Sequence, residues 1–186
     1  MDAKNLIALT GFMGSGKSRI GRELAGRLGF PFFDLDEVIE REEQQQIPDI
    51  FRSKGEEYFR MLERLHLRNL LEHRPAVLAL GGGANQQEEI RDLLQQNAVT
   101  IYLQVPIDTL VVRLQKDKKR PLLRDASGKL LDGDQLRDRI AGLLEKREPL
   151  YRKADITVPV QPLWSKHQTT SELIRLLDNH APNALP

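Results

Sequence analysis

The chain has 186 residues, a formal net charge of +1 and no cysteine. The lack of cysteine excludes a disulfide framework, thiolate metal ligands and a cysteine nucleophile. The near-zero charge provides no overall basic field that would favour nucleic acid or an anionic membrane. With 40% hydrophobic residues and no apolar run of membrane length, the sequence indicates one soluble, cytoplasmic domain of enzyme size.

Short apolar segments rich in β-branched or aromatic residues alternate with helical patterns along the chain. The strand-like segments cover residues 5–10, 30–35, 76–80, 98–105 and 154–160. Helical patterns cover, among others, residues 17–28, 56–71, 88–96, 107–115, 134–148 and 170–179. This alternation predicts an α/β fold with a five-stranded, mainly parallel sheet between helices. We expect a single domain over residues 1–180 and a flexible tail over residues 181–186.

The first strand-like segment leads into GFMGSGKS, residues 11–18. These residues match G-x-x-x-x-G-K-[ST] between a predicted strand and a predicted helix, which is the context of a phosphate-binding loop. Backbone amides of such a loop surround a phosphate, the lysine reaches the terminal phosphates and the serine hydroxyl binds Mg²⁺. The alternative is a glycine-rich turn with an incidental Lys-Ser. The predicted ATP-binding residues of the loop are Gly14, Ser15, Gly16, Lys17 and Ser18.

Asp34 and Asp36 lie at the C-terminal end of the second strand-like segment, in FFDLDEVIE. This position is the carboxyl edge of the predicted sheet, where open α/β sheets bind ligands. If the chain is extended there, both carboxylates point to the same side, toward the phosphate loop. One would hold Mg²⁺ through water and the other would accept a proton from an attacking hydroxyl. The alternative is that Asp36 only caps the helix that follows.

Two further clusters concern the acceptor of the phosphate. In GEEYFRMLE, residues 55–63, Arg60 and Glu63 are three apart at a helix start and therefore neighbours. They form either a surface ion pair or a cleft-facing fork, in which Arg60 binds a carboxylate and Glu63 orients it. In LALGGGA, residues 78–84, three glycines follow a buried-strand pattern. Such a run lets backbone amides approach a ligand closely at the same edge.

Residues 116–133 form a segment with an excess of positive charge. The segment is either a solvated surface loop or a mobile lid that brings cations over the phosphates. As part of a lid, Arg120 in RPLL would stabilise the charge of the phosphate in transfer. Arg147 in REPLY would be a second fork for an acidic substrate, although each arginine taken alone is better explained as a solvated side chain. Pro149 predicts a kink or a helix end nearby.

The ordered set GFMGSGKS, DLD, GEEYFR with Glu63, GGG, RPLL and REPLY closely resembles shikimate kinases, which are small P-loop kinases related in fold to nucleoside monophosphate kinases. The resemblance covers residues 11–151. It implies ATP-dependent phosphorylation of the 3-hydroxyl of shikimate, in the pathway to chorismate and the aromatic amino acids. It further implies ATP and shikimate as partners, Mg²⁺ as the cofactor and a monomer, with no nucleic-acid or membrane partner.

The resemblance also implies the roles of individual residues. The expected catalytic residues are Lys17, Asp36 and Arg120. The expected metal-binding residues are Ser18 and, through water, Asp34. The expected shikimate-binding residues are Asp36, Arg60, Gly81, Gly82, Gly83 and Arg147. For ATP, Arg120 comes from the lid and Arg113 packs near the adenine. After the last strand no adenine contact is assigned, and Trp164 either stacks on a base or caps the core.

Other functions share parts of this pattern. A gluconate-type or nucleoside monophosphate kinase has the same loop, fold and lid, but GE-x-x-FR together with GGG argues against both. A GTP-driven switch would need guanine recognition, and no N-K-x-D-type segment is present. An inactive relative that serves as an interaction protein disagrees with the intact Lys17, Asp34, Asp36 and Arg120.

Overall fold

The computed structural model describes residues 6–115, 121–125 and 128–185. Its strands are β1 (Leu6–Thr10), β2 (Phe32–Asp34), β3 (Ala76–Ala79), β4 (Val99–Gln104) and β5 (Ile156–Pro159). Its α-helices are α1 (Lys17–Leu28), α2 (Leu35–Glu43), α3 (Ile47–Leu70), α4 (Glu88–Asn97), α5 (Ile107–Leu114), α6 (Gly133–Tyr151) and α7 (Lys166–His180). Short 3₁₀ helices are η1 (Ala84–Gln86), η2 (Pro121–Leu123) and η3 (Pro182–Ala184).

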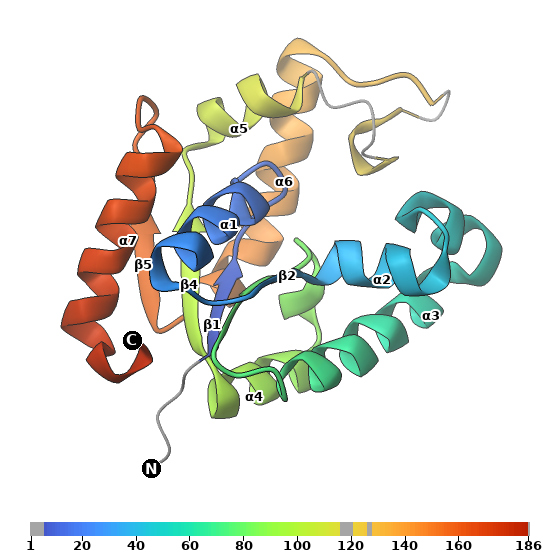
Figure 1. Ribbon diagram of the computed structural model, residues 1–186. Coiled ribbons are helices and arrows are strands. Elements are labelled where there is room, and N and C mark those ends of the chain that lie inside the picture. Colours follow the sequence, from blue (N-terminus) through green and yellow to red (C-terminus); the bar gives the residue numbers. More distant parts are fainter. Residues whose placement is uncertain (1–5, 116–120, 126–127, 186) are drawn as a thin grey trace.

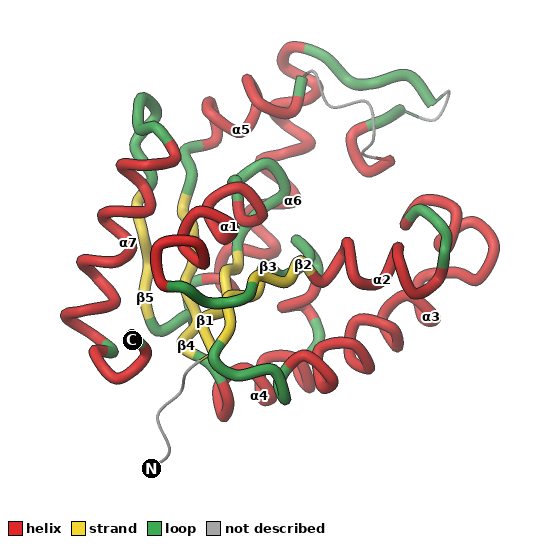
Figure 2. The backbone as a smooth tube through the Cα atoms, viewed as in Figure 1, coloured by secondary structure: helices red, strands yellow, loops and turns green. Residues whose placement is uncertain are grey.

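The strands form one sheet in the order β2-β3-β1-β4-β5, and every neighbouring pair is parallel. Figure 2 shows the strands at the centre of the molecule with helices around them. The predicted α/β fold with a five-stranded parallel sheet is therefore confirmed. Because all strands run the same way, the segments that follow them meet at one carboxyl edge, where such sheets bind ligands.

The two faces of the sheet carry separate hydrophobic clusters, because successive strand side chains point to opposite faces. Ile7 and Leu9 of β1 pack in a cluster with residues of α1 and α7. Leu6 and Ala8 of the same strand pack in a second cluster with residues of α2, α3 and α4. The result is a three-layer arrangement in which the sheet lies between two sets of helices (Figure 1).

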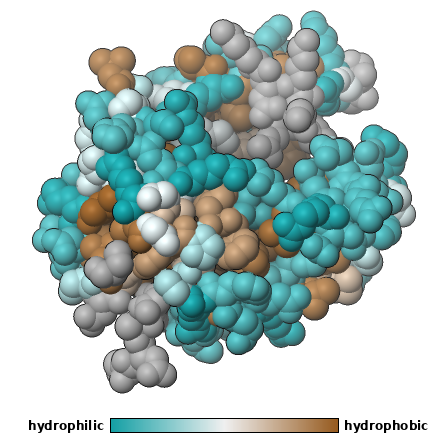
Figure 3. Space-filling view, viewed as in Figure 1, coloured by the Kyte–Doolittle hydropathy of each residue, from teal (hydrophilic) through white to brown (hydrophobic). Residues whose placement is uncertain are grey.

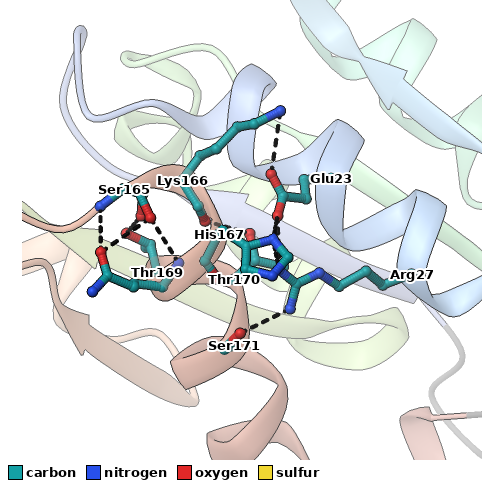
Figure 4. A network of polar contacts seen from close by, with 9 residues as sticks. Glu23, Arg27, Ser165, Lys166, His167, Thr169, Thr170 and Ser171 are labelled. Atoms are coloured by element: carbon teal, nitrogen blue, oxygen red, sulfur yellow. Dashed lines mark hydrogen bonds and ion pairs between the residues drawn. The ribbon is translucent and has the colours of Figure 1, made fainter.

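Helices α1 and α7 are also joined by polar contacts (Figure 4). Arg27 of α1 donates to Glu23 Oε1 at 2.8 Å and to Ser171 Oγ of α7 at 2.9 Å. His167 Nδ1 of α7 lies 2.8 Å from Glu23 Oε1. Helix α7 itself begins in a capping box at Ser165. These contacts hold the helix that follows the glycine-rich loop firmly against the last helix of the fold.

Several element boundaries differ from the sequence-based prediction. Helix α3 begins at Ile47, nine residues before the predicted start at residue 56, and is interrupted at Gly55, whose φ is 82° and ψ 175°. Glycine alone adopts these angles readily. Strand β2 is shorter than predicted because α2 begins at Leu35, directly after it. Residues 182–184, placed in a flexible tail by the sequence, form η3, and Ala184 there is buried.

The face of the molecule seen in Figure 3 is mostly hydrophilic, with small apolar areas between the polar side chains. In the part of the chain that the structure describes, no helix is both long enough and apolar enough to cross a membrane. Large apolar side chains exposed among these residues are Met61, Leu65, Val112, Leu122 and Leu163.

Candidate active site

The glycine-rich loop lies between β1 and α1, as the motif requires. Gly14 and Gly16 have φ values of 77° and 97°, in the left-handed region that favours glycine, and Gly16 is the N-cap of α1. Lys17 Nζ donates to the carbonyl oxygens of Gly11 at 2.9 Å and Phe12 at 3.1 Å, so its side chain lies along the loop. Backbone amides at the start of a helix and the positive end of its dipole favour an anion at such a position.

A cavity of about 260 Å³ opens beside this loop. It is lined by residues of the loop, of the end of β2 and of the glycine run, namely Met13, Gly14, Gly16, Lys17, Ser18, Arg19, Asp34, Asp36, Leu80 and Gly82. The fold thus brings to one cavity residues that the sequence places in three separate motifs. The cavity is large enough for phosphate groups and part of a small acceptor between the two glycine-rich segments.

Asp34 occupies the centre of a small polar network at the end of β2. Its Oδ1 accepts from the backbone amides of Asp36 at 3.1 Å and Glu37 at 3.4 Å, so Asp34 is the N-cap of α2. Its Oδ2 accepts from the hydroxyl of Ser18 at 2.5 Å. A hydroxyl and a carboxylate are the hard oxygen ligands that suit Mg²⁺, directly or through water. The two predicted metal-binding residues therefore form a donor set that fits this ion.

This network corrects two expectations about Asp36, the capping alternative and the extended backbone, and leaves its role as proton acceptor a prediction. The capping residue is Asp34, not Asp36. The expected extended backbone ends at Asp34, and Asp36 lies in the first turn of α2. Both carboxylates nevertheless line the same cavity as Lys17. The direct strand-to-helix junction, with no loop between, brings Asp36 to the cavity.

Arg60 and Glu63 form a largely buried ion pair in α3. Arg60 Nη1 donates to Glu63 Oε2 at 2.7 Å, and Nη2 donates to Glu56 Oε1 at 2.9 Å. The Arg60 side chain is 18% exposed and that of Glu63 only 1%, so the surface ion pair that the sequence left open is wrong. Gln87 Nε2 also donates to Glu63 Oε2, at 2.8 Å. No sequence pattern points to Gln87, which follows η1 and meets α3 only in the folded chain.

Electrostatics at this pair follow from its burial. Burial raises the pKa of Glu63 to about 7, against the attraction of the Arg60 charge. Burial alone would lower the pKa of Arg60, but the charges of Glu63 and Glu56 raise it above its ordinary value. Arg60 therefore stays charged, and the Glu63 carboxyl titrates near neutral pH.

The glycine run after β3 passes very close to these charged side chains. A Cβ atom on Gly81 would lie 2.6 Å from Asp36 Oδ1 and 3.1 Å from Glu63 Oε1. A Cβ atom on Gly83 would lie 3.0 Å from both Nη1 and Nη2 of Arg60. At 2.6 Å a shift is unavoidable, and at 3.0 to 3.1 Å the neighbour must give by a few tenths of an ångström, so a side chain on Gly81 would displace Asp36 and one on Gly83 would press on Arg60.

Helix α6 reaches the same glycine run from the other side. Arg147 Nη1 donates to the carbonyl oxygen of Gly82 at 3.3 Å, and the hydroxyl of Tyr151 donates to the same oxygen. Both side chains belong to buried residues. The helix continues through Pro149 and ends at Tyr151, so the predicted helix end comes two residues after the proline. Tyr151 is the last residue of REPLY, and sequence reasoning gave it no role.

The remaining predicted residues do not line the cavity or lie outside the part of the chain that the structure describes. Arg113 Nη1 of α5 donates to the carbonyl oxygens of Gly14 at 3.1 Å and Ser15 at 3.3 Å, and burial lowers its pKa. Arg120 lies outside the described residues, as does part of the predicted lid at residues 116–133. Trp164 is half-buried in the segment between β5 and α7 and is not among the residues that line the cavity.

A parallel sheet in this strand order, with a phosphate-binding loop after β1, is the fold of P-loop nucleoside triphosphate-binding proteins. The acidic residues beside the loop, with the buried Arg147 and the partly buried Arg60 beside the glycine run, are groups that suit a small anionic acceptor. Together they define the class of the protein as an ATP-dependent small-molecule kinase.

Comparisons with known proteins point to one family within this class. The family model for shikimate kinase matches residues 13–178. The chain is 46% identical over 154 residues to the shikimate kinase of Chlorobium chlorochromatii, covering 83% of this chain and 81% of that protein. With the shikimate kinase of Chlorobaculum parvum it is 39% identical over 180 residues, or 97% of this chain and 96% of the relative.

Solved structures agree with these relatives. The shikimate kinase of Acinetobacter baumannii in complex with shikimate superposes with a TM-score of 0.84 and 35% identity, over 94% of this chain and 93% of that chain. The chain therefore belongs to the shikimate kinase family, whose members are ATP-dependent kinases that phosphorylate a hydroxyl of shikimate in the biosynthesis of aromatic amino acids.

Proposed function

We propose that this chain transfers the γ-phosphate of ATP to the 3-hydroxyl of shikimate, giving shikimate 3-phosphate and ADP, at the cavity beside the glycine-rich loop. One observation supports this most directly. Lys17, Ser18, Asp34 and Asp36 line the same cavity of about 260 Å³ as Gly82 of the glycine run. A phosphate donor on the loop and an acceptor on the glycine run would therefore meet beside Asp36.

ATP would bind over residues 11–18. The amides of Gly14, Ser15 and Gly16 would surround its phosphates, next to the positive end of α1. Lys17 would turn from the loop carbonyls to the outer phosphates, a short movement for a flexible side chain. Arg113, which already contacts the back of the loop, would lie on the nucleoside side.

Mg²⁺ would be held by the Ser18 hydroxyl and, through water, by Asp34, whose oxygen atoms lie 2.5 Å apart. When bound, the ion neutralises phosphate charge and orients the outer phosphates. The hydrogen bond between Ser18 and Asp34 sets the place of both ligands before the ion arrives. In this arrangement Asp34 also fixes the first turn of α2, and with it the position of Asp36.

Shikimate carries one carboxylate and several hydroxyl groups, and the acceptor half of the site matches both. The carboxylate would be bound by the guanidinium groups of Arg60, which lies against Gly83, and of Arg147, which donates to the carbonyl oxygen of Gly82. The 3-hydroxyl would contact Asp36, which lines the cavity beside the phosphate loop. Gly81, Gly82 and Gly83 would line the space for the ring, because a side chain on Gly81 would collide with Asp36, one on Gly83 would press on Arg60, and one on Gly82 would press on the loop backbone at Met13.

In the transfer step Asp36 would orient the hydroxyl for in-line attack and accept its proton. Lys17 would stabilise the charge on the phosphate in transfer. We propose the same role for Arg120, which would come from a lid formed by residues 116–133 and exclude water from the site. All proposed site residues come from one chain, so we further propose that the enzyme works as a monomer, which sedimentation analysis tests.

The test of the proposed function is an acceptor panel. Purified protein is mixed with MgATP and shikimate, gluconate or a nucleoside monophosphate, ADP release is followed, and the product is identified by mass. ADP formed with shikimate alone, together with a monophosphorylated product, is the expected result. Turnover with gluconate or a nucleotide instead would overturn the proposed acceptor site while leaving the phosphate loop in place.

A further inference from the structure

We propose that Tyr151 is a positioning residue for the phosphorylation of shikimate. Its hydroxyl would fix the carbonyl of Gly82 and thereby the conformation of the Gly81–Gly83 run. The inference rests on the proposed function of that run as the acceptor-binding segment. Tyr151 would act through the backbone of the run, without itself touching the acceptor.

The starting observation is a single carbonyl with two side-chain donors. The oxygen of Gly82 accepts from the Tyr151 hydroxyl and from Arg147 Nη1, and both donors come from the last turns of α6. Three glycines in sequence have no side chains that could lock their backbone by packing, so their conformation depends on hydrogen bonds. The two donors of α6 supply this restraint at the centre of the run.

The direction of this carbonyl determines what the acceptor meets. The peptide bond between Gly82 and Gly83 is trans, so the Gly83 amide points away from the oxygen that Tyr151 holds. Gly83 lies against the guanidinium group of Arg60, while Gly82 lines the cavity beside the phosphate loop. Rotation of this peptide would exchange the positions of the Gly83 amide, a donor, and the Gly82 carbonyl, an acceptor. The acceptor molecule would then meet the opposite kind of polar group.

Tyr151 is better suited to this role than Arg147. Its ring is buried and packs on Tyr102, with the ring centroids 5.4 Å apart, so its hydroxyl has one fixed direction. Burial also raises the pKa of Tyr151 to about 12, which keeps the hydroxyl a donor over the physiological range of pH. Arg147 is the proposed ligand of the shikimate carboxylate. When the N–H groups of Arg147 turn to that carboxylate, the Tyr151 hydroxyl still donates to the Gly82 carbonyl.

The decisive variant is Tyr151→Phe, with Tyr102→Phe as its matched control. Both changes remove one hydroxyl from the same pair of stacked rings, but the Tyr102 hydroxyl lies 3.5 Å from Glu148, away from the glycine run. Losing the Tyr151 bond should raise KM for shikimate roughly two- to tenfold and leave KM for ATP unchanged. Tyr102→Phe should leave both values near those of the wild type. Equal changes in both KM values for Tyr151→Phe, or no change, would overturn the proposal.

Two further measurements keep the outcome unambiguous. If the wild type does not phosphorylate shikimate, the proposed function fails. If Arg147→Lys raises KM for shikimate while Tyr151→Phe does not, the function stands and the role of Tyr151 is wrong.

Should Tyr151→Phe not fold, 3-fluorotyrosine incorporated into the wild type reports on its tyrosines by ¹⁹F resonance, assigned with Tyr58→Phe and Tyr102→Phe. Shikimate should shift the Tyr151 resonance more than that of Tyr102, and equal or absent shifts would contradict the proposal.

Discussion

The Ser18 hydroxyl donates to Asp34 Oδ2 at 2.5 Å, and this bond joins the first turn of α1 to the end of β2. The other oxygen of the same carboxylate caps α2. One side chain thus links the phosphate loop, the proposed metal site and the helix that bears Asp36. The charge of Asp34 and its capping of α2 can be separated by substitution with asparagine, because asparagine caps helices as well as aspartate does but carries no charge.

We therefore expect Asp34→Asn and Asp34→Ala to differ in stability but not in activity. Asparagine keeps the cap and loses the charge, so its free energy of unfolding should stay near that of the wild type. Alanine loses both, and should reduce the free energy of unfolding by about 1 kcal/mol. Turnover should fall roughly 10- to 100-fold in both variants. Urea denaturation and Mg²⁺-dependent ADP release measure the two effects, and a fully active Asp34→Asn would remove Asp34 from the metal site.

Asp36→Asn keeps the size of the side chain and removes its charge and basicity. Turnover should drop roughly 10²- to 10⁴-fold, as expected when a general base is lost, while ATP binding measured by calorimetry should persist. Glu37→Gln is the control, since Glu37 lies in the same first turn of α2 but is 57% exposed and pairs with Arg22. Near-normal turnover of Asp36→Asn would exclude the proposed role of this residue.

Gly81→Ala tests the close approach of the glycine run to the acidic groups. The added Cβ would lie 2.6 Å from Asp36 Oδ1, so Asp36 must rotate away from its place beside the cavity. We expect a folded protein with roughly 10²-fold lower turnover, because small misplacements of reacting groups are costly. Gly142→Ala in α6 meets nothing within 4 Å and should instead stabilise the fold by about 0.5 to 1 kcal/mol without loss of activity. Wild-type turnover of Gly81→Ala would contradict the geometry.

Glu63 should give the enzyme a distinctive dependence of stability on pH. Its pKa is raised from 4.5 to about 7 by burial, so above pH 4.5 the unfolded chain releases this proton before the folded chain does. The contribution of the group to stability is thus complete below pH 4.5 and is lost as pH rises through 7. Urea titrations between pH 5 and 8 give the free energy of unfolding of the wild type and of Glu63→Gln. As the pH rises, the wild type should lose stability relative to the glutamine variant. A difference independent of pH would show that the pKa is not raised.

The order of elements could be predicted from the sequence because buried strands and amphipathic helices have different periodicities. The polar detail could not. Arg60 and Glu63 have the spacing of any surface ion pair, and only the packed fold shows that Glu63 is 1% exposed. The contact between Tyr151 and Gly82 joins residues 69 positions apart, which no local pattern reveals. Asp34 and Asp36 were placed at the correct edge, but their roles at the start of α2 depend on where β2 ends.

The two hydrophobic clusters on opposite faces of the sheet have a consequence for local unfolding. Leu35, Val38 and Phe59, which anchor the helices that bear Asp36 and Arg60, all belong to the cluster of α2, α3 and α4. Ile20 and Leu24, which anchor the helix behind the phosphate loop, belong to the other cluster. Amides of α2 and of the first turns of α3 should therefore exchange with solvent through openings that leave α1 protected. An enzyme divided in this way can retain its nucleotide while the part of the acceptor site on α2 and α3 opens to admit or release a small molecule.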